Sequence, residues 1–386
     1  MKVATIKIPF TEEEIQRIQT KVGEVLRTGY LTMGKNVEDF ERKFSEYNGS
    51  KYAIGVNSGF SALEICLRSL DIQDSSVIVP VNTSIATPNS VLQAGGKVIF
   101  CDVLKEDFGM DPEDFKRKVR EDTKAIIPVH IAGIISPRLY EIMDICKKRG
   151  IAVIEDAAHA HGATIDGKKA GSLGLAGAFS FYPTKVMTSG EGGIITTDDE
   201  EIFKKACSIR NYGRRDFKKV NQYDDFGYNG RLSEFHAIVG VEQIMKADWI
   251  LKERRRIASI YDEKLKGLEG IEIIEIPKNV ESAYYKYVVY LKEKIDRDRL
   301  KEEIKKKYGI VLPAEVYSEH CHSQPVYQQN PKNMENSPKE RFPGAEFVCG
   351  RQLCLSLYPG LKEKEIDYVA GALEDALKYI VKDINN

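Results

Sequence analysis

Long apolar runs and an excess of charge of either sign are missing from this sequence of 386 residues. No segment contains the run of about eighteen apolar residues that a transmembrane helix needs. Residues 1–18 carry Glu12, Glu13 and Glu14 in place of the basic and apolar regions of a secretory signal. We therefore expect a cytoplasmic protein without a membrane partner.

The charges of the chain are almost balanced. Lys and Arg number 57 against 58 Asp and Glu, which gives a formal net charge of −1. A balanced chain has no overall attraction for polyanions. We therefore expect no nucleic-acid partner.

Signatures of metal and disulfide chemistry are also missing. The seven cysteines form no CxxC pair, and an odd number of scattered cysteines is not a disulfide framework. The six histidines lack HExxH spacing, and His320 and His322 have no obvious thiol or carboxylate partners. The sequence predicts reduced thiols and no metal site.

Short apolar runs alternate with amphipathic stretches between about residues 50 and 200. Most of these runs are continuous, as expected for parallel strands that are buried on both faces. Helical patterns such as 61–70 and 138–149 lie between several of them, which indicates a three-layer α/β domain. The seven expected strands are 52–56, 77–79, 98–101, 125–129, 152–154, 178–182 and 193–197.

The pattern changes after a long helical stretch, expected at about 233–268 and interpreted as a connection between domains. We expect a large domain over residues 1–250 and a small α+β domain over residues 251–386. The elements expected in the second are strands at 271–276 and 284–291, helices at 296–307 and 363–381, and a loop at 324–343.

Polar residues that follow apolar strands are the first candidates for chemistry, because ligands of open parallel sheets collect at the carboxyl ends of the strands. Asp156 ends one run, and His159 follows it; taken alone, a helix-capping acid explains this pattern better. Ser180 belongs to another run, and Lys185 follows Pro183 on a glycine-rich loop. A lone loop lysine is usually a solvated surface residue. The acid, the hydroxyl and the glycines together make Lys185 a catalytic candidate.

The segment 57–62, Asn-Ser-Gly-Phe-Ser-Ala, stands between an expected strand and an expected helix. Free amides at a helix N-terminus bind phosphate readily, although an ordinary Ser-capped turn explains the pattern equally well. The segment has no Walker lysine, so it does not predict a nucleoside-triphosphate loop.

Three segments, read in order, resemble the DegT/DnrJ/EryC1/StrS family of sugar aminotransferases that depend on pyridoxal 5′-phosphate (PLP). They are 155–163 (EDAAHAHGA), 180–193 (SFYPTKVMTSGEGG) and 227–234 (GYNGRLSE). The resemblance extends from 26–32 to 355–360. It implies a type I PLP fold, like that of aspartate aminotransferase, in which a large three-layer domain with a mostly parallel seven-stranded sheet precedes a small C-terminal α+β domain. It also implies a homodimer with shared active sites.

The resemblance assigns roles to single residues. Lys185 matches the catalytic lysine that carries PLP, and Asp156 matches the carboxylate that keeps the ring nitrogen protonated. Asn229 matches a residue that reaches the phosphate from the neighbouring subunit. The other cofactor-binding residues are Gly59, Phe60, Ser61 and Ser180 at the phosphate, and His159 beside the ring.

Two cofactor positions depart from the family pattern. Phe60 stands where Thr is usual, which removes one hydroxyl from the phosphate site, and Ser61 is the candidate to replace it. Ser84 stands where an aromatic residue usually stacks on the ring, so we expect the stacking group to come from elsewhere, with Phe60 as a candidate.

The segment 316–327 resembles the part of the family that lies near the substrate. Tyr317 and His322 match the substrate-binding pattern, whereas Val316 and His320 do not. We therefore expect a substrate pocket that is atypical for the family.

The resemblance implies transfer of an amino group from an amino acid, glutamate or glutamine, to a nucleotide-linked keto-deoxysugar. A PLP-dependent sugar dehydratase is an alternative, but such enzymes carry His where this chain has Lys185. A catalytically silent, PLP-binding regulatory protein on the same fold is the other alternative. The lysine favours amino transfer.

Overall fold

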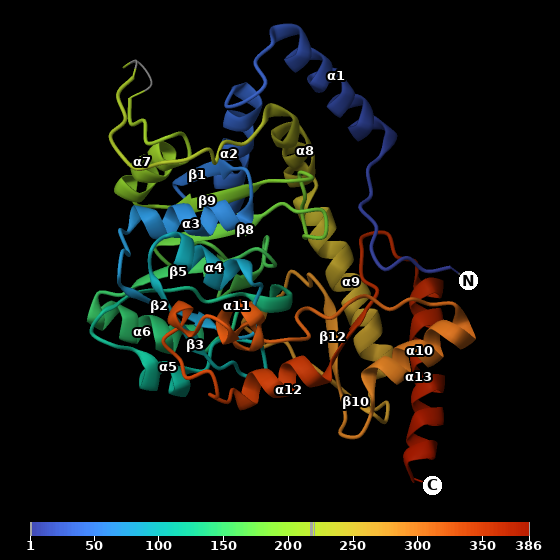
Figure 1. Ribbon diagram of the computed structural model, residues 1–386. Helices are drawn as coiled ribbons and strands as arrows, with labels where there is room; N and C mark the ends of the chain where they lie inside the picture. Colours follow the sequence, from blue (N-terminus) through green and yellow to red (C-terminus); the bar gives the residue numbers. More distant parts are fainter. Residues whose placement is uncertain (1, 217–218, 220, 386) are drawn as a thin grey trace.

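A seven-stranded sheet forms the centre of the computed structural model, which describes residues 2–216, 219 and 221–385 (Figure 1). The strands are β1 (Tyr52–Val56), β2 (Ser76–Pro80), β3 (Lys97–Cys101), β4 (Thr123–Ile126), β5 (Ala152–Asp156), β8 (Ala176–Ser180) and β9 (Gly193–Thr197). Their order is β1-β9-β8-β5-β4-β2-β3, and only β9 runs antiparallel to its neighbours. The predicted strands and the mostly parallel α/β sheet are confirmed.

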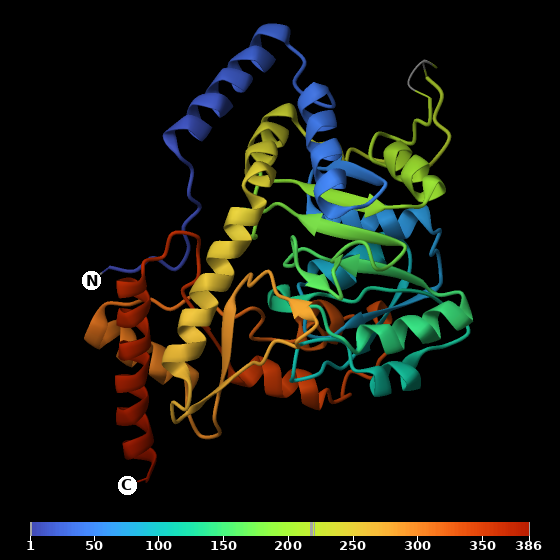
Figure 2. The ribbon, with the colours of Figure 1, turned by 180° about the vertical axis from the view of Figure 1, so that it is seen from behind.

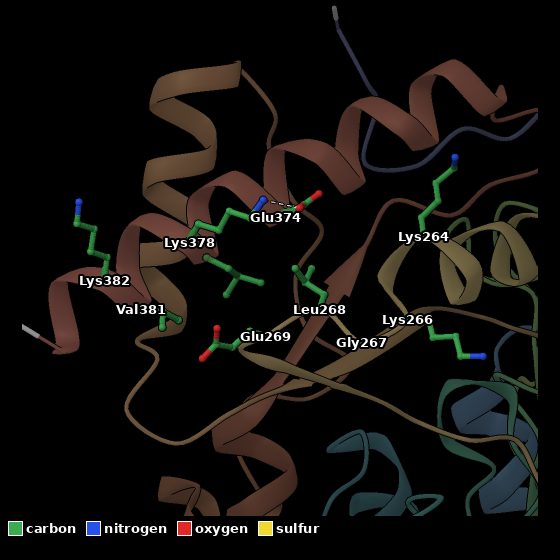
Figure 3. Close-up of a pocket in the computed structure, with 10 residues that line it drawn as sticks. Lys264, Lys266, Gly267, Leu268, Glu269, Glu374, Lys378, Val381 and Lys382 are labelled. Atoms are coloured by element: carbon green, nitrogen blue, oxygen red, sulfur yellow. Dashed lines mark hydrogen bonds and ion pairs between the residues drawn. The ribbon is translucent and has the colours of Figure 1, made fainter.

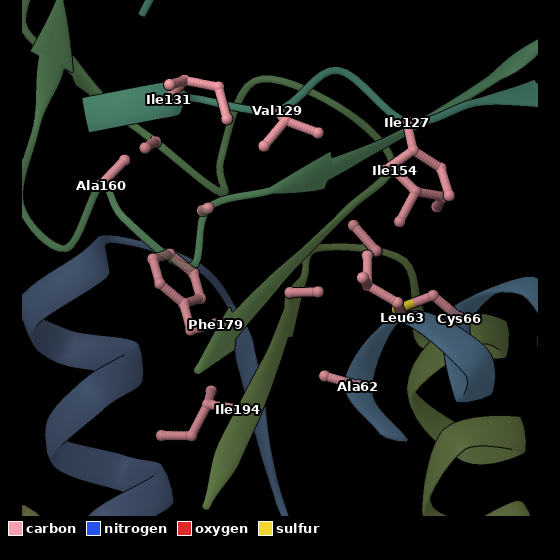
Figure 4. Close-up of a cluster of buried hydrophobic side chains, with 14 of the residues drawn as sticks. Ala62, Leu63, Cys66, Ile127, Val129, Ile131, Ile154, Ala160, Phe179 and Ile194 are labelled. Carbon is pink, nitrogen blue, oxygen red and sulfur yellow. The ribbon is translucent and has the colours of Figure 1, made fainter. Parts of the chain in front are cut away.

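Helices cover both faces of this sheet, because successive side chains of a buried strand point to opposite faces. Val77 and Val79 of β2 belong to the main cluster, which includes α3 (Gly59–Ser69) and α4 (Ala86–Gln93). Ile78 packs on the other side with α5 (Pro112–Lys118) and α6 (Leu139–Arg149). Figure 4 shows the main cluster where Leu63 of α3 faces the strands.

The first 265 residues form further helices. They are α1 (Glu12–Thr28), α2 (Lys35–Asn48), α7 (Glu200–Ile209), α8 (Glu234–Met245) and α9 (Ala247–Leu265). Helix α1 begins with a capping box in which the side chains of Thr11 and Glu14 each bond the other's backbone amide. It reaches outward from the body (Figure 1) and is tied to α8 by the Arg17–Glu242 ion pair, 2.7 Å.

A second hydrophobic cluster surrounds the C-terminal half of α9, which runs from the large sheet into this region (Figure 2). Its antiparallel sheet has the order β10-β12-β13. The elements are β10 (Ile271–Ile273), β12 (Tyr287–Leu291), β13 (Gln352–Leu355), α10 (Arg297–Tyr308) and α13 (Glu363–Asn385). The domain boundary predicted between residues 250 and 251 falls inside α9 and stays a prediction.

The prediction of one long helix at 233–268 is wrong, because the helix is interrupted between α8 and α9. Lys246 leaves the helical conformation with φ −115° and ψ 15°. Its Nζ donates to the backbone oxygen of Pro9 at 2.6 Å and to Glu14 Oε2 at 2.7 Å. The N-terminal segment therefore supplies the partners of the residue at which the helix breaks.

The loop predicted at 324–343 is also wrong in part. It contains α11 (Pro325–Gln328) and a 3₁₀ turn (Pro331–Asn333), and α12 (Pro343–Arg351) begins at its end. Short elements elsewhere are β6 (Thr164–Ile165), β7 (Lys168–Lys169), β11 (Val280–Glu281) and 3₁₀ turns at Ile131–Gly133 and Cys321–Ser323. Across the described part of the chain, no helix has both the length and the apolar character to cross a bilayer.

Candidate active site

A cavity lies at the carboxyl ends of β5 and β8, which pair in parallel with Asp156 opposite Ala178. The structure here brings together most of the residues predicted for the cofactor and one predicted for the substrate. The lining consists of Gly59, Phe60, Leu63, Ser84, Ala86, Val129, Asp156, Ala158, His159, Ser180, Lys185 and Tyr317.

A different cavity, of about 510 Å³, lies between the C-terminal end of α9 and α13 (Figure 3). Its lining is rich in lysine, but it includes none of the predicted site residues. Lys378 is paired there with Glu374 at 2.6 Å, and Lys264 is paired with Asp367. These pairs are solvated surface contacts, so we place the chemistry at the sheet.

Asp156 is held in one orientation at the end of β5. Its Oδ2 accepts a hydrogen bond from Thr87 Oγ1 at 2.8 Å, and its Oδ1 accepts one from the Ala158 amide at 3.2 Å. Burial raises the pKa of Asp156, while these two hydrogen bonds and the charge of Lys185 act in the opposite direction. A protonated nitrogen facing this carboxylate would favour its ionised form.

Lys185 lies on the loop after β8, where its amide donates to the carbonyl of Tyr182 at 3.0 Å. Its Nζ lies 5.1 Å from the ring centroid of Tyr285 and makes no hydrogen bond within the described residues. Burial lowers the pKa of Lys185 to about 8, with Asp156 opposing the shift and Lys286 adding to it. The amine is therefore available for covalent chemistry close to neutral pH.

The lowered pKa predicts how the rate of cofactor uptake depends on pH. Only the neutral amine attacks an aldehyde, so the rate at which the apo-protein takes up PLP should rise through about pH 8 and then level off. An unperturbed lysine would continue to rise to about pH 10.4. Stopped-flow absorbance across this range measures the midpoint. Lys286→Met should move the midpoint upward, because it removes a neighbouring positive charge; a midpoint near 10 in the unmodified protein would contradict the assignment.

The N-terminus of α3 faces the end of β8 at very short range. A Cβ atom at Gly59 would lie 2.7 Å from Ser180 Cβ, so a larger residue would push the helix away from Ser180. The first amides of a helix have no acceptor within the helix and carry a partial positive charge. The Ser61 amide already donates to Ser58 Oγ at 3.1 Å, so the cradle suited to a phosphate group consists of the Gly59 and Phe60 amides and the Ser180 hydroxyl.

Three aromatic rings form a stack on one side of the cavity. The His159 ring lies 4.0 Å from that of Tyr285, with an interplanar angle of 17°, and 5.8 Å from that of Tyr317. His159 Nε2 is 3.3 Å from the Tyr317 hydroxyl, whereas Nδ1 is buried without a partner. Burial lowers the pKa of His159 well below its usual value, so the ring that faces the cavity is neutral. Sequence reasoning missed Tyr285, whose only local signal is its place in the strand predicted at 284–291.

Three predicted residues do not line the cavity. The Ser61 hydroxyl accepts a hydrogen bond from Ser58 Oγ at 3.1 Å and lies outside the lining of the cavity, so its replacement of the missing threonine hydroxyl stays a prediction. Asn229 is exposed, and its carbonyl accepts from Asn57 Nδ2 at 3.3 Å. His322 is buried beside Phe342, and its Nε2 lies 3.1 Å from the backbone oxygen of Ser337.

The chain belongs to the DegT/DnrJ/EryC1/StrS aminotransferase family, whose model matches residues 12–374. It is 35% identical over 376 residues to an uncharacterized protein of Methanocaldococcus jannaschii, covering 94% of both chains. It is 30% identical to the dTDP-3-amino-3,4,6-trideoxy-alpha-D-glucose transaminase of Micromonospora megalomicea subsp. nigra, covering 95% of this chain and 96% of that one.

Among solved structures, NtdA from Bacillus subtilis with bound cofactor PMP superposes with a TM-score of 0.85 at 28% identity. The match covers 96% of this chain and 85% of that one. Family and fold together identify a PLP-dependent transaminase of the sugar aminotransferase family with a type I PLP fold.

The residues at the cavity fit PLP. The cradle of Gly59 and Ser180 suits its phosphate, Asp156 suits its ring nitrogen, and His159 lines the space that remains for its ring. The unpaired amine of Lys185 suits its aldehyde. Once bound, PLP supplies an electron sink that stabilises a carbanion next to nitrogen.

Proposed function

We propose that the protein transfers an amino group from glutamate or glutamine to the keto group of a nucleotide-linked keto-deoxysugar. The observation that carries this proposal is the free Lys185 amine in the same cavity as the buried Asp156. The similarity to a dTDP-amino-sugar transaminase supports the substrate class. A dehydratase is disfavoured, because a lysine stands at the position where those enzymes carry histidine.

Each residue of the cavity has a task in this reaction. The neutral amine of Lys185 accepts a proton from one carbon bonded to the transferred nitrogen and returns it to the carbon on the other side of that nitrogen, and a pKa of about 8 suits both steps. Asp156 keeps a positive charge opposite its carboxylate. His159 offers a neutral face that neither gains nor loses charge near neutral pH. Tyr317 brings its hydroxyl to the edge of the cavity.

The keto sugar is proposed to bind on the far side of Tyr317. Another cavity, of about 390 Å³, includes this residue and neighbours of Ser84 in its lining. Its polar groups include Thr83, Ser318 and Gln324, which suit the hydroxyl groups of a sugar. Tyr317 thus connects the cavity of Lys185 with the proposed substrate cavity. His322 lies outside both linings, so we propose that it supports the 324–343 segment.

The proposal is tested by reconstituting the purified protein with PLP and offering glutamate or glutamine together with dTDP-, UDP- or GDP-linked keto sugars. We expect consumption of one amine donor that depends on one class of keto sugar, with an amino sugar as the product. Chromatography coupled to mass spectrometry measures both. Failure to retain PLP after reconstitution, or donor consumption that does not depend on any keto sugar, would overturn the proposal.

A homodimer with shared sites is also proposed. The single chain leaves large apolar side chains exposed on α1, just after α1, on the catalytic loop and in the stretch between α7 and α8, and such side chains commonly mark protein interfaces. They include Leu26 (62% exposed), Tyr30 (70%), Tyr182 (47%) and Phe226 (87%). Asn229, which is exposed in the single chain, would reach the phosphate of the neighbouring subunit in such a dimer.

Mixing two inactive variants tests this arrangement. Asn229→Asp should weaken PLP binding, because its carboxylate would face the phosphate at short range. Combined with Lys185→Ala under subunit exchange, it should give a heterodimer in which one site carries both changes and the other carries neither. Activity is then expected to reappear on mixing, approaching one quarter of the wild-type value per subunit at equal amounts. No recovery, with exchange demonstrated by sedimentation of labelled subunits, would place Asn229 at its own subunit's site or at none.

We also propose a cytoplasmic location. All seven cysteines are free thiols, and most of them are buried. Burial raises the pKa of several, including Cys66 and Cys146, to about 12, which makes them poor nucleophiles. A reducing compartment is where such a set of thiols is usually found.

A further inference from the structure

A separate cavity, of about 340 Å³, lies behind the aromatic stack of the active site and has no role in the proposed reaction. We name it the Arg254 cavity. It is formed by α9, the residues before β12, the stretch after α10, and the N-terminal segment. Its lining consists of Thr5, Ile6, Thr184, Arg254, Tyr285, Lys286, Val311, Leu312, Pro313, Ala314, Leu355 and Leu357.

Arg254 is a buried cation whose hydrogen-bonding capacity is mostly unused. It is 3% exposed, and only its Nη1 has acceptors, the carbonyls of Tyr284 at 2.9 Å and Tyr285 at 3.3 Å. Its Nε is buried without a partner, and Nη2 makes no hydrogen bond within the described residues. The hydrogen bonds to the backbone of Tyr284 and Tyr285 therefore use one of the three guanidinium nitrogens of Arg254.

The charge of Arg254 is also unbalanced. Burial lowers its pKa to about 10, and no carboxylate counters that shift. A buried charge without a counter-ion is costly for a folded protein. The second cation of the lining, Lys286, donates within the described residues only to the backbone oxygens of Ala314 and Glu315. The lining itself contains no Asp or Glu, so two positive charges face this cavity without an acid.

The rest of the wall is apolar, and it sets the kind of anion that fits. Seven of the twelve lining residues are Ile, Val, Leu, Pro or Ala. A free phosphate would leave these side chains in contact with water, whereas a carboxylate with a hydrocarbon chain would cover them. Ile6 (41%) and Val311 (51%) are exposed, which leaves a route from solvent between them.

We propose that the Arg254 cavity is a binding site for a small carboxylate with an apolar chain, held by Arg254 and Lys286. This site goes beyond the proposed amino transfer and does not depend on it. It adjoins the catalytic cavity through a shared wall: Tyr285 stacks on His159, and its hydroxyl lies 3.2 Å from Thr184 Oγ1, one residue before Lys185. A bound carboxylate would therefore place a negative charge behind that wall.

The test uses the PLP-loaded enzyme and hexanoate, which has neither an amino nor a keto group and so cannot enter the reaction. Calorimetry or ligand-observed NMR should show saturable binding of hexanoate, with 1-hexanol and inorganic phosphate binding at least about tenfold more weakly. Equal binding of 1-hexanol would mean an apolar pocket without carboxylate recognition. Binding of phosphate in preference to hexanoate would mean a site for a different anion. Either result overturns the proposal, as does the absence of saturable binding.

Matched variants locate the bound hexanoate. Arg254→Met keeps the length of the side chain and should weaken binding about tenfold or more, the effect expected for a lost charge-assisted hydrogen bond. Arg255→Met is the control, because Arg255 points outward to Glu281 at 3.1 Å from the same helix. Lys286→Met provides a second test at a partly exposed position if Arg254→Met does not fold. Hexanoate binding that survives both Arg254→Met and Lys286→Met would place it elsewhere, and the proposal would fail even if amino transfer is confirmed.

Discussion

Lys185→Ala is expected to abolish amino transfer. Alanine can neither link to the cofactor nor move a proton, and proton transfer by a positioned side chain alone contributes about 10²–10⁴-fold to such rates. The variant should also lose the cofactor that sodium borohydride fixes to the chain. Mass spectrometry of the reduced protein and a donor-consumption assay measure the two losses.

The matched control for Lys185→Ala is Lys286→Ala, since Lys286 also lies over the ring of Tyr285. Lys286 contributes to the low pKa of Lys185, but its own Nζ is engaged with the carbonyls of Ala314 and Glu315. Lys286→Ala should therefore keep the borohydride-fixed cofactor on Lys185. Covalent cofactor retained by Lys185→Ala after reduction would show that another amine is the attachment point.

The strand-end residues of the site were predictable because their signal is local. Asp156 and Ser180 each end an apolar strand, and neighbouring parallel strands bring their carboxyl ends to one edge of the sheet. The same argument places Lys185 near that edge, since Pro183 closes the strand before it. The family pattern then supplied roles that position alone does not give.

The side chains that contact these site residues carry no local signal in the sequence. Thr87 bonds Asp156 across 69 residues of sequence, and Tyr285 packs on His159 from the region before β12. Neither contact follows from spacing or periodicity. Arg254 belongs to the charged run 252–256, a pattern typical of a solvated helix face, whereas it is buried and donates to the carbonyls of Tyr284 and Tyr285. Those carbonyls lie outside β12, which explains why the strand starts later than its apolar pattern predicts.

Proline explains the helices that sequence reasoning missed after residue 324. Pro325, Pro331 and Pro343 each stand at the first or second position of a helix or 3₁₀ turn. Proline is favoured there, because that position needs no amide donor and its fixed φ suits a helix. A composition rich in Pro, Asn and Gln is typical of a loop, although the same prolines mark helix starts.

The last prediction concerns the carboxylate opposite the ring nitrogen. Asp156→Asn keeps the size of the side chain and can still accept the hydrogen bond from Thr87 or from Ala158 through one oxygen. It no longer offers a negative charge, so it does not hold a facing nitrogen in its protonated form. We expect the rate of amino transfer to fall by about 10²- to 10³-fold, the scale seen when one preorganised electrostatic group is removed from an active site.

Asp107 offers a matched comparison for this change. It is likewise a buried carboxylate with a pKa raised by burial, and it accepts hydrogen bonds from the Gly109 amide at 2.9 Å and from the Ser136 side chain. Asp107→Asn should alter the thermal stability by a similar amount while leaving the rate of amino transfer within about threefold of wild type, because it lies outside the cavity of Lys185.

If Asp156→Asn also stays within threefold, the negative charge of Asp156 has no part in catalysis. If both variants lose activity together with thermal stability, the loss belongs to folding. Only a loss confined to Asp156→Asn, in a protein that melts like the Asp107 variant, supports the pairing of this carboxylate with the ring nitrogen.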